Sequence, residues 1–308
     1  MVAAMSRHLA PALLAAFAVI APASAAADAR VFACEPEWAA LAGEIGGGDV
    51  TVYSATHGRQ DPHSIRARPS LIAQVRRADI VFCSGAELEV GWLPVLMERG
   101  ARRGVQPGQP GHLMAAEHVE VMERPERIDR SLGDIHPGGN PHVHLDPGNI
   151  ARLAVELAGR LARVDPANEG AYRSRLADFE ARWGAATKRW RARAEGLRGT
   201  KVVVHHAAWV YLLGWTGLDL VARVERISGV PPTASHLRDV VERVRTTGAA
   251  AILLAPHDPV DAAGWLSERT GVPVVELPFT VGGQDEAGDL FALFDVTLAL
   301  LEKARDRS

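Results

Sequence analysis

The sequence lacks an excess of positive charge. Its 308 residues carry a formal net charge of −3 at pH 7. Nucleic-acid-binding domains normally show a basic face or a high isoelectric point, so the composition argues against a nucleic-acid partner. Beyond the N-terminus there is also no apolar run of the roughly 20 residues that a membrane-spanning helix needs. With 47% hydrophobic residues, the chain can build real cores, and we expect a soluble mature protein of about two domains.

Residues 1–26 have the three parts of a secretory signal peptide. A short positive start at 6–8 precedes an apolar run at 9–21, and Ala-Ser-Ala at 23–25 fits a cleavage site. An N-terminal membrane anchor is the alternative, but the apolar run is short for that role. We therefore expect a periplasmic protein that is released by cleavage.

Cysteine is scarce, with only Cys34 and Cys83 in the whole chain. Each lies at or near the end of a predicted strand. In an exported protein a single pair of cysteines favours a disulfide. Two buried thiols are the alternative, and zinc ligation is the weakest interpretation because neither cysteine belongs to a metal-type pair.

Several catalytic motifs are missing too. The chain has no His-Glu-x-x-His, no Gly-x-Ser-x-Gly and no phosphate-binding loop of an ATPase. An exported zinc hydrolase that uses His142 and His144 is the enzymatic alternative. It would need a nearby general base and an open metal position for water, and no base is evident. We therefore expect a protein that is not an enzyme.

Strands alternate with helices in two halves of the chain, which predicts an α/β fold of two parallel-sheet lobes. Between the halves, an apolar stripe predicts one long helix. Its residues alternate at spacings of four and three: Tyr172, Leu176, Phe179, Trp183, Ala186 and Trp190. At roughly 30 residues it would be about 45 Å long, which suits a strut between lobes. We expect a signal peptide at 1–26, an N-terminal lobe at 27–164, the linking helix at 165–199 and a C-terminal lobe at 200–308. The predicted strands are 31–33, 50–54, 79–84, 202–205, 218–224, 250–254 and 272–277, and the other predicted helices are 37–45, 68–78, 91–99, 146–164, 207–213, 234–245, 260–270 and 288–303.

Residues 100–141 are rich in Gly and Pro and show no clear periodicity. A long irregular segment inside a compact domain is usually functional or mobile. This one carries His112, His118 and His136. A histidine-bearing loop would be able to sample zinc, and an ordinary solvated loop is an equally good interpretation because the histidines are scattered.

Three separated histidines are the candidate ligands of a metal site: His63, His142 and His206. Each lies in a loop or at the end of a predicted strand, and in open α/β sheets ligands bind beyond the carboxyl ends of strands. Neutral imidazole suits zinc, which usually takes four ligands. In His-Val-His at 142–144, a strand conformation would direct both imidazoles to the same face.

The motifs around these histidines resemble those of the solute-binding proteins of zinc and manganese ABC importers (TroA-like), and the resemblance covers most of the mature chain. Asp-Pro-His-Ser at 61–64, followed by Arg-Pro-Ser at 68–70, is similar to the first signature of that family. Asn-Pro-His-Val-His-Leu-Asp-Pro at 140–147 resembles the second, with His144 where Trp usually stands. His-Ala-Ala-Trp-Val-Tyr at 206–211 resembles the third, so His206 rather than His205 takes the ligand position.

This resemblance implies that Zn²⁺ binds between the lobes on His63, His142 and His206. Thr-Val-Gly-Gly at 280–283 looks like the loop of the zinc-specific branch, in which an acidic ligand follows, and we expect Asp285 to be the fourth ligand. Glu276, Asp289 or water are the alternatives. Three imidazoles and one carboxylate favour zinc, because manganese prefers oxygen ligands.

The resemblance also implies the partners. These are an ABC permease in the inner membrane with a separate cytoplasmic ATPase, and a periplasmic zinc metallochaperone is a further candidate. We expect a monomer whose long helix restricts hinge motion. A surface adhesin is another alternative, but it would predict a lipid-anchoring cysteine at the mature N-terminus, and the signal sequence has none.

Overall fold

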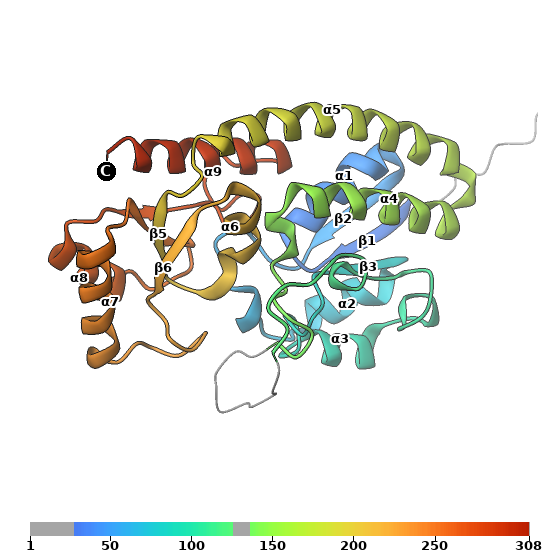
Figure 1. Cartoon of the computed structure of the whole chain (residues 1–308). Coiled ribbons are helices and arrows are strands. Elements are labelled where there is room, and N and C mark those ends of the chain that lie inside the picture. Colours follow the sequence, from blue (N-terminus) through green and yellow to red (C-terminus); the bar gives the residue numbers. More distant parts are fainter. Residues whose placement is uncertain (1–27, 126–135, 308) are drawn as a thin grey trace, which may run out of the picture.

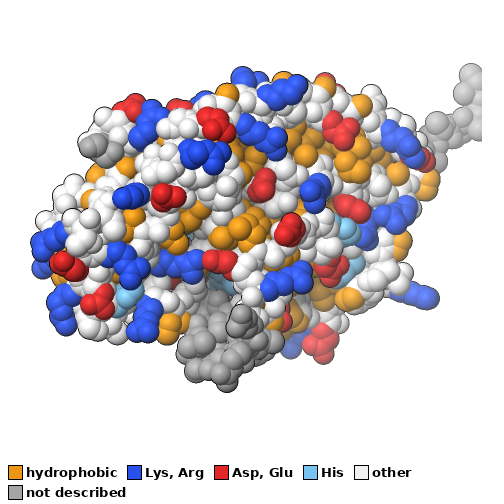
Figure 2. All heavy atoms as spheres, in the orientation of Figure 1, with side chains coloured by type: hydrophobic (Ala, Val, Ile, Leu, Met, Phe, Trp, Pro, Cys, Tyr) orange, Lys and Arg blue, Asp and Glu red, His pale blue; other side chains and the backbone are white. Residues whose placement is uncertain are grey.

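The computed structural model describes residues 28–125 and 136–307, so the predicted signal peptide lies outside the described residues. Two α/β lobes lie side by side below a long helix, α5 (Glu169–Glu195), with α9 (Leu290–Arg305) beside its C-terminal half (Figure 1). The predicted fold class is thus confirmed. On the face shown in Figure 2, basic and acidic side chains are interspersed and do not separate by sign. No helix in the described part of the chain combines the length and the hydropathy of a membrane span.

The N-terminal lobe contains a four-stranded parallel sheet in the order β2-β1-β3-β4. Every residue of β3 is buried, as expected for a central strand covered by helices on both faces. A proline stands at the start of α1, α2 and α4, where its missing N–H costs nothing. The elements of this lobe are β1 (Ala29–Ala33), α1 (Pro36–Gly46), β2 (Val50–Ser54), α2 (Pro69–Arg77), β3 (Ile80–Cys83), α3 (Leu93–Gly100), β4 (His112–Met114) and α4 (Pro147–Val164).

Two predictions for this lobe have clear outcomes. Cys34 follows β1 and Cys83 ends the neighbouring strand β3, and the two form a disulfide with a Cα–Cα distance of 4.8 Å, so that prediction is confirmed. The interpretation of 100–141 as irregular is partly wrong, because β4 lies within it. Three residues among glycines and prolines are too few to show a strand period, and only pairing with β3 defines this strand.

The C-terminal lobe repeats the same strand order, as β6-β5-β7-β8, again with all strands parallel. Glycines in the left-handed conformation end two of its helices, Gly217 after α6 and Gly271 after α8. The elements are β5 (Lys201–Val204), α6 (Val210–Thr216), β6 (Asp219–Arg223), α7 (Ala234–Thr247), β7 (Ala251–Leu254), α8 (Val260–Thr270) and β8 (Val274–Glu276).

Helix α5 joins the lobes through the predicted aromatic stripe. Its buried side chains pack against α1 and α4 of one lobe and against α6 and α9 of the other. The Trp183 indole donates to the carbonyl of Pro147 at 2.8 Å, and the Trp190 indole donates to Asp295 Oδ1 at 2.8 Å. The 27 residues of α5 span about 40 Å at 1.5 Å per residue. One continuous hydrophobic cluster therefore includes residues of both lobes.

Candidate metal centre

His63, His142 and His206 meet between the two lobes. One possible ligand atom from each lies within 4.8 Å of the other two. His63 lies in a 3₁₀ turn, Pro62–Ser64, in the loop after β2, and His206 follows the carboxyl end of β5. His142 stands at the start of the 3₁₀ turn Val143–Leu145. The carboxyl ends of two parallel sheets thus face one another across the site, which is where α/β folds bind their ligands.

The imidazole of His142 has the properties of a metal ligand. Its side chain is 1% exposed, and neither ring nitrogen has a hydrogen-bond partner. Leaving buried polar atoms unpaired is costly, and a metal ion would satisfy one of them. Burial, reinforced by the charges of His63 and His206, lowers the pKa of His142 well below its usual value. The ring is therefore neutral at physiological pH, which is the form that ligates metals.

A carboxylate holds each of the other two imidazoles. His63 Nδ1 lies 2.7 Å from Asp61 Oδ1, and His206 Nδ1 lies 2.8 Å from Glu225 Oε2. Such carboxylate–histidine pairs fix the tautomer and orientation of a metal-binding ring. Burial raises the pKa of Asp61, but its hydrogen bonds with His63 outweigh this and leave the pKa below the ordinary range. In Glu225 burial likewise raises the pKa, but the imidazoles of His205 and His206 beside the carboxylate outweigh this and give a pKa of about 2.

Our sequence reasoning missed both carboxylates. Asp61 had a local signal, since it stands two residues before His63 and also accepts the backbone N–H of that histidine at 2.9 Å. Glu225 had no such signal. It reaches His206 only because β6, which it follows, pairs with β5.

His144 does not join the three histidines. The two imidazoles do not share a face as they would on a strand, because residues 143–145 form a 3₁₀ turn that directs the His144 ring elsewhere. His144 Nε2 lies 2.9 Å from the carbonyl oxygen of Phe279, and Nδ1 lies 3.2 Å from Glu37 Oε1. The Glu37 carboxylate also accepts the hydroxyl of Thr280. His144 thus connects the N-terminal lobe to the loop after β8, and the pair at 142 and 144 does not converge on one metal as a hydrolase would require.

Three carboxylates were candidates for the fourth ligand, and none lies in the histidine group. Asp285 is exposed, Glu276 is exposed at the end of β8, and Asp289 caps α9 by accepting the N–H of Ala292 at 2.8 Å. The loop that carries Asp285 is held against the other lobe. A Cβ on Gly58 would lie 2.2 Å from the carbonyl carbon of Gly282. The ligand role of Asp285 stays a prediction that requires this loop to move.

The structure separates the three histidines of the 100–141 segment. His112 lies on β4, and His118 lies 3.5 Å from Glu156 on α4. His136 alone reaches the site, with its Nε2 3.3 Å from His63 Nε2. Burial, with the charges of His63 and His206, lowers the pKa of His136 to about 4.

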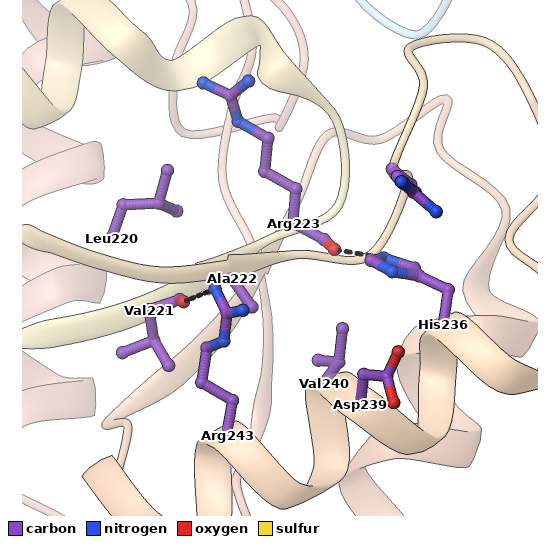
Figure 3. Close-up of a pocket in the computed structure, with 9 residues that line it drawn as sticks. Leu220, Val221, Ala222, Arg223, His236, Asp239, Val240 and Arg243 are labelled. Carbon is purple, nitrogen blue, oxygen red and sulfur yellow. Dashed lines mark hydrogen bonds between the residues drawn. The ribbon is translucent and has the colours of Figure 1, made fainter.

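A hollow of about 530 Å³ lies away from the histidines, on the C-terminal lobe between β6 and α7 (Figure 3). It is lined by Arg223, Arg226, His236 and Arg243. The His236 ring lies 2.9 Å from the carbonyl of Arg223, and Arg243 contacts the carbonyl of Val221. These contacts cover the free edge of β6, a strand that has a neighbour on one side only, so we assign them a structural role.

Comparison with known proteins places this geometry among periplasmic metal carriers. Residues 31–304 match the model of a family described as "Zinc-uptake complex component A periplasmic". The chain is 27% identical over 234 residues to the high-affinity zinc uptake system protein ZnuA of Paracoccus denitrificans, covering 65% of this chain and 68% of the relative. It is 22% identical over 291 residues to the manganese transporter lipoprotein PsaA of Streptococcus anginosus, covering 90% of this chain and 91% of the relative. A crystal structure of ZnuA shares the fold, with a TM-score of 0.73 at 19% identity over 89% of this chain and 98% of that one.

Proposed function

The chain belongs to the family of periplasmic zinc-uptake component A proteins, and from this premise we propose that it binds Zn²⁺ between its lobes and delivers it to an ABC importer. The observation that carries the proposal is the meeting of three histidines from two lobes. One of the three, His142, is buried and has no hydrogen-bond partner on its ring. The zinc ion is cargo. The partners in this proposal are a membrane permease and a separate cytoplasmic ATPase, and the chain works in the periplasm after its signal peptide is cleaved.

Zinc is the proposed cargo because of the donor set. Related proteins are named for zinc and for manganese, so family membership leaves the metal open. Three imidazoles form a borderline-soft set that suits zinc, whereas manganese prefers carboxylate, carbonyl and water oxygens. Asp61 and Glu225 act through His63 and His206, which they orient toward the ion.

The first test is zinc binding to the mature protein after removal of bound metal by a chelator. We expect one tightly bound zinc per chain and much weaker binding of manganese. His206→Ala should weaken zinc binding about 100-fold or more, because about 10–16 kcal/mol of binding free energy is shared among four ligands. His236→Ala is the matched control, since His236 lies on the same lobe outside the site. Normal zinc binding by the His206 variant, or a preference for manganese, would contradict the proposal.

A further inference from the structure

We infer that His136 is the fourth ligand of the transported metal and completes a site of four imidazoles. This inference rests on the proposed function and specifies its coordination. The starting observation is the distance of 3.3 Å between Nε2 of His136 and Nε2 of His63. Four nitrogens in a tetrahedron at about 2.0–2.1 Å from zinc lie about 3.3–3.4 Å apart. The two rings are therefore already spaced like two ligands of one zinc ion.

The ring of His142 also lies near that of His136. The ring centroid of His136 lies 5.3 Å from that of His63 and 6.4 Å from that of His142. His136 is not yet within the mutual distances of the other three, so its imidazole must rotate toward them on binding. That movement involves one half-buried side chain. A ligand role for Asp285 requires an exposed residue on a packed loop to cross to the site.

A strained turn packs against the chain segment that carries His136. Gly85, Ala86 and Glu87 have φ values of 76°, 49° and 67°, so three consecutive residues adopt the left-handed conformation. Two of them carry side chains, which makes this conformation costly, and such strain persists only where the surrounding structure enforces it. The backbone of Ala86 and Glu87 lies near the His136 imidazole, whose Nδ1 is buried and has no hydrogen-bond partner. The chain after His136 packs closely on the same turn, because a Cβ on Gly138 would lie 3.0 Å from the Cα of Ala86.

A buried carboxylate enforces the turn. Glu89 is 3% exposed and accepts the backbone N–H of Ser84 at 2.7 Å and that of Gly85 at 3.1 Å. Glu89 thus fixes the entry to the turn, and the backbone at Gly138 packs on the turn at Ala86. His136, two residues before Gly138, presents Nε2 to His63. Strained backbone of this kind is concentrated at ligand-binding sites. A site of four imidazoles would also discriminate against manganese more strongly than one with a carboxylate.

The test compares His136→Gln with Asp285→Asn, using His118→Gln as a control that removes a histidine near the same segment but outside the site. Two readouts are needed: the dissociation constants for Zn²⁺ and Mn²⁺, and the visible spectrum of bound Co²⁺, whose bands report the number and type of ligand atoms. We expect His136→Gln to weaken zinc binding by at least about tenfold, the loss that even outer-shell changes produce, and to change the Co²⁺ spectrum. Manganese binding should hardly change in this variant, and Asp285→Asn and His118→Gln should match the parent protein.

His136→Asp guards against a variant that only disturbs the fold. It supplies an oxygen ligand, so it should recover part of the zinc affinity and bind manganese better than His136→Gln does. A His136→Gln protein with an unchanged Co²⁺ spectrum and unchanged zinc affinity would overturn the inference, as would a change of both in Asp285→Asn alone. In either case, loss of zinc binding in His206→Ala would leave the proposed function standing.

Discussion

The two lobes share one strand order, yet they are stabilised by different means. The N-terminal lobe holds the disulfide, three buried carboxylates (Glu35, Glu37 and Glu89) against one, Glu225, in the C-terminal lobe, and every described non-glycine residue with positive φ. It also provides two of the three clustered histidines. The C-terminal lobe has no cysteine and supplies only His206.

The difference indicates that the two lobes contribute to the metal site in different ways. A site that spans two bodies needs one of them to define the geometry, and the lobe with more ligands is also the more constrained. The constraints lie next to the site: Cys34 precedes Glu35, Cys83 precedes Ser84, and the strained turn begins at Gly85. The C-terminal lobe then needs only to present one imidazole to a preformed half-site.

The largest effect should come from removing the covalent constraint. Cys34→Ala combined with Cys83→Ala opens a loop with a sequence separation of 49. We expect the free energy of unfolding to fall by about 4 kcal/mol, because the unfolded chain regains the entropy of that loop. Urea unfolding of the metal-free protein measures this. A loss of unfolding free energy below about 1 kcal/mol would show that the disulfide adds little to the stability of the N-terminal lobe.

The next effect compares the carboxylates behind the histidines, one on each lobe. Asp61→Asn and Glu225→Gln each remove a charge that orients one imidazole, and each should weaken zinc binding by about 10–100-fold. Asp178→Asn, on the exposed side of α5, is the control. Chelator competition at pH 7 gives the three affinities. An effect confined to Glu225→Gln would mean that His63 keeps its position without the Asp61 carboxylate. The N-terminal half of the site would then be more rigid than the C-terminal half.

The smallest effect concerns pH and the buried acids of the N-terminal lobe. Burial, with the neighbouring charge of Glu89, raises the pKa of Glu35 well above its usual value, and burial raises the pKa of Glu89 to about 7. A carboxyl whose pKa is raised in the folded state retains its proton there after the unfolded chain has lost it. Stability from this pair is therefore present below about pH 4.5 and is lost as the pH rises toward about 7.

Glu35→Gln removes one member of the pair and keeps its shape. Between pH 5 and pH 7 the variant should lose less free energy of unfolding than the parent, by up to about 1.4 kcal/mol per pH unit. Urea unfolding across this range checks the difference, and taking the difference cancels groups that titrate equally in both proteins. Parallel curves would show that the acid pair does not set the pH response of this lobe.

A feature could be predicted from the sequence when the residue pattern that specifies it lies within one segment of the chain. The long helix and the alternation of strands and helices depend on spacing within one segment, so α5, the C-terminal sheet and three of the four N-terminal strands were predicted correctly. The three histidines carry motifs around them, and the structure brings these residues together. β4 has only three residues and no pattern of its own, and the turn that redirects His144 depends on contacts with the other lobe.

The sequence contained less information about the surroundings of the site. Glu225 is far from His63 along the chain and carries no metal-binding motif, so only the folded arrangement relates it to the site. The sequence indicated His136 together with His112 and His118 but did not show which of the three reaches the site. The strained turn at Gly85–Glu87 was equally hidden, because alanine and glutamate do not normally indicate the left-handed conformation.

The continuous hydrophobic cluster along α5 has a consequence for how the molecule comes apart. Because it includes Trp38 and Leu153 on one side and Leu253 and Phe294 on the other, neither lobe can lose this part of its packing without exposing apolar surface of its neighbour. We therefore expect the two lobes to unfold together, although each is an α/β unit with its own sheet. In thermodynamic language we expect one cooperative unit that has two lobes, and heating should carry it from folded to unfolded in a single transition.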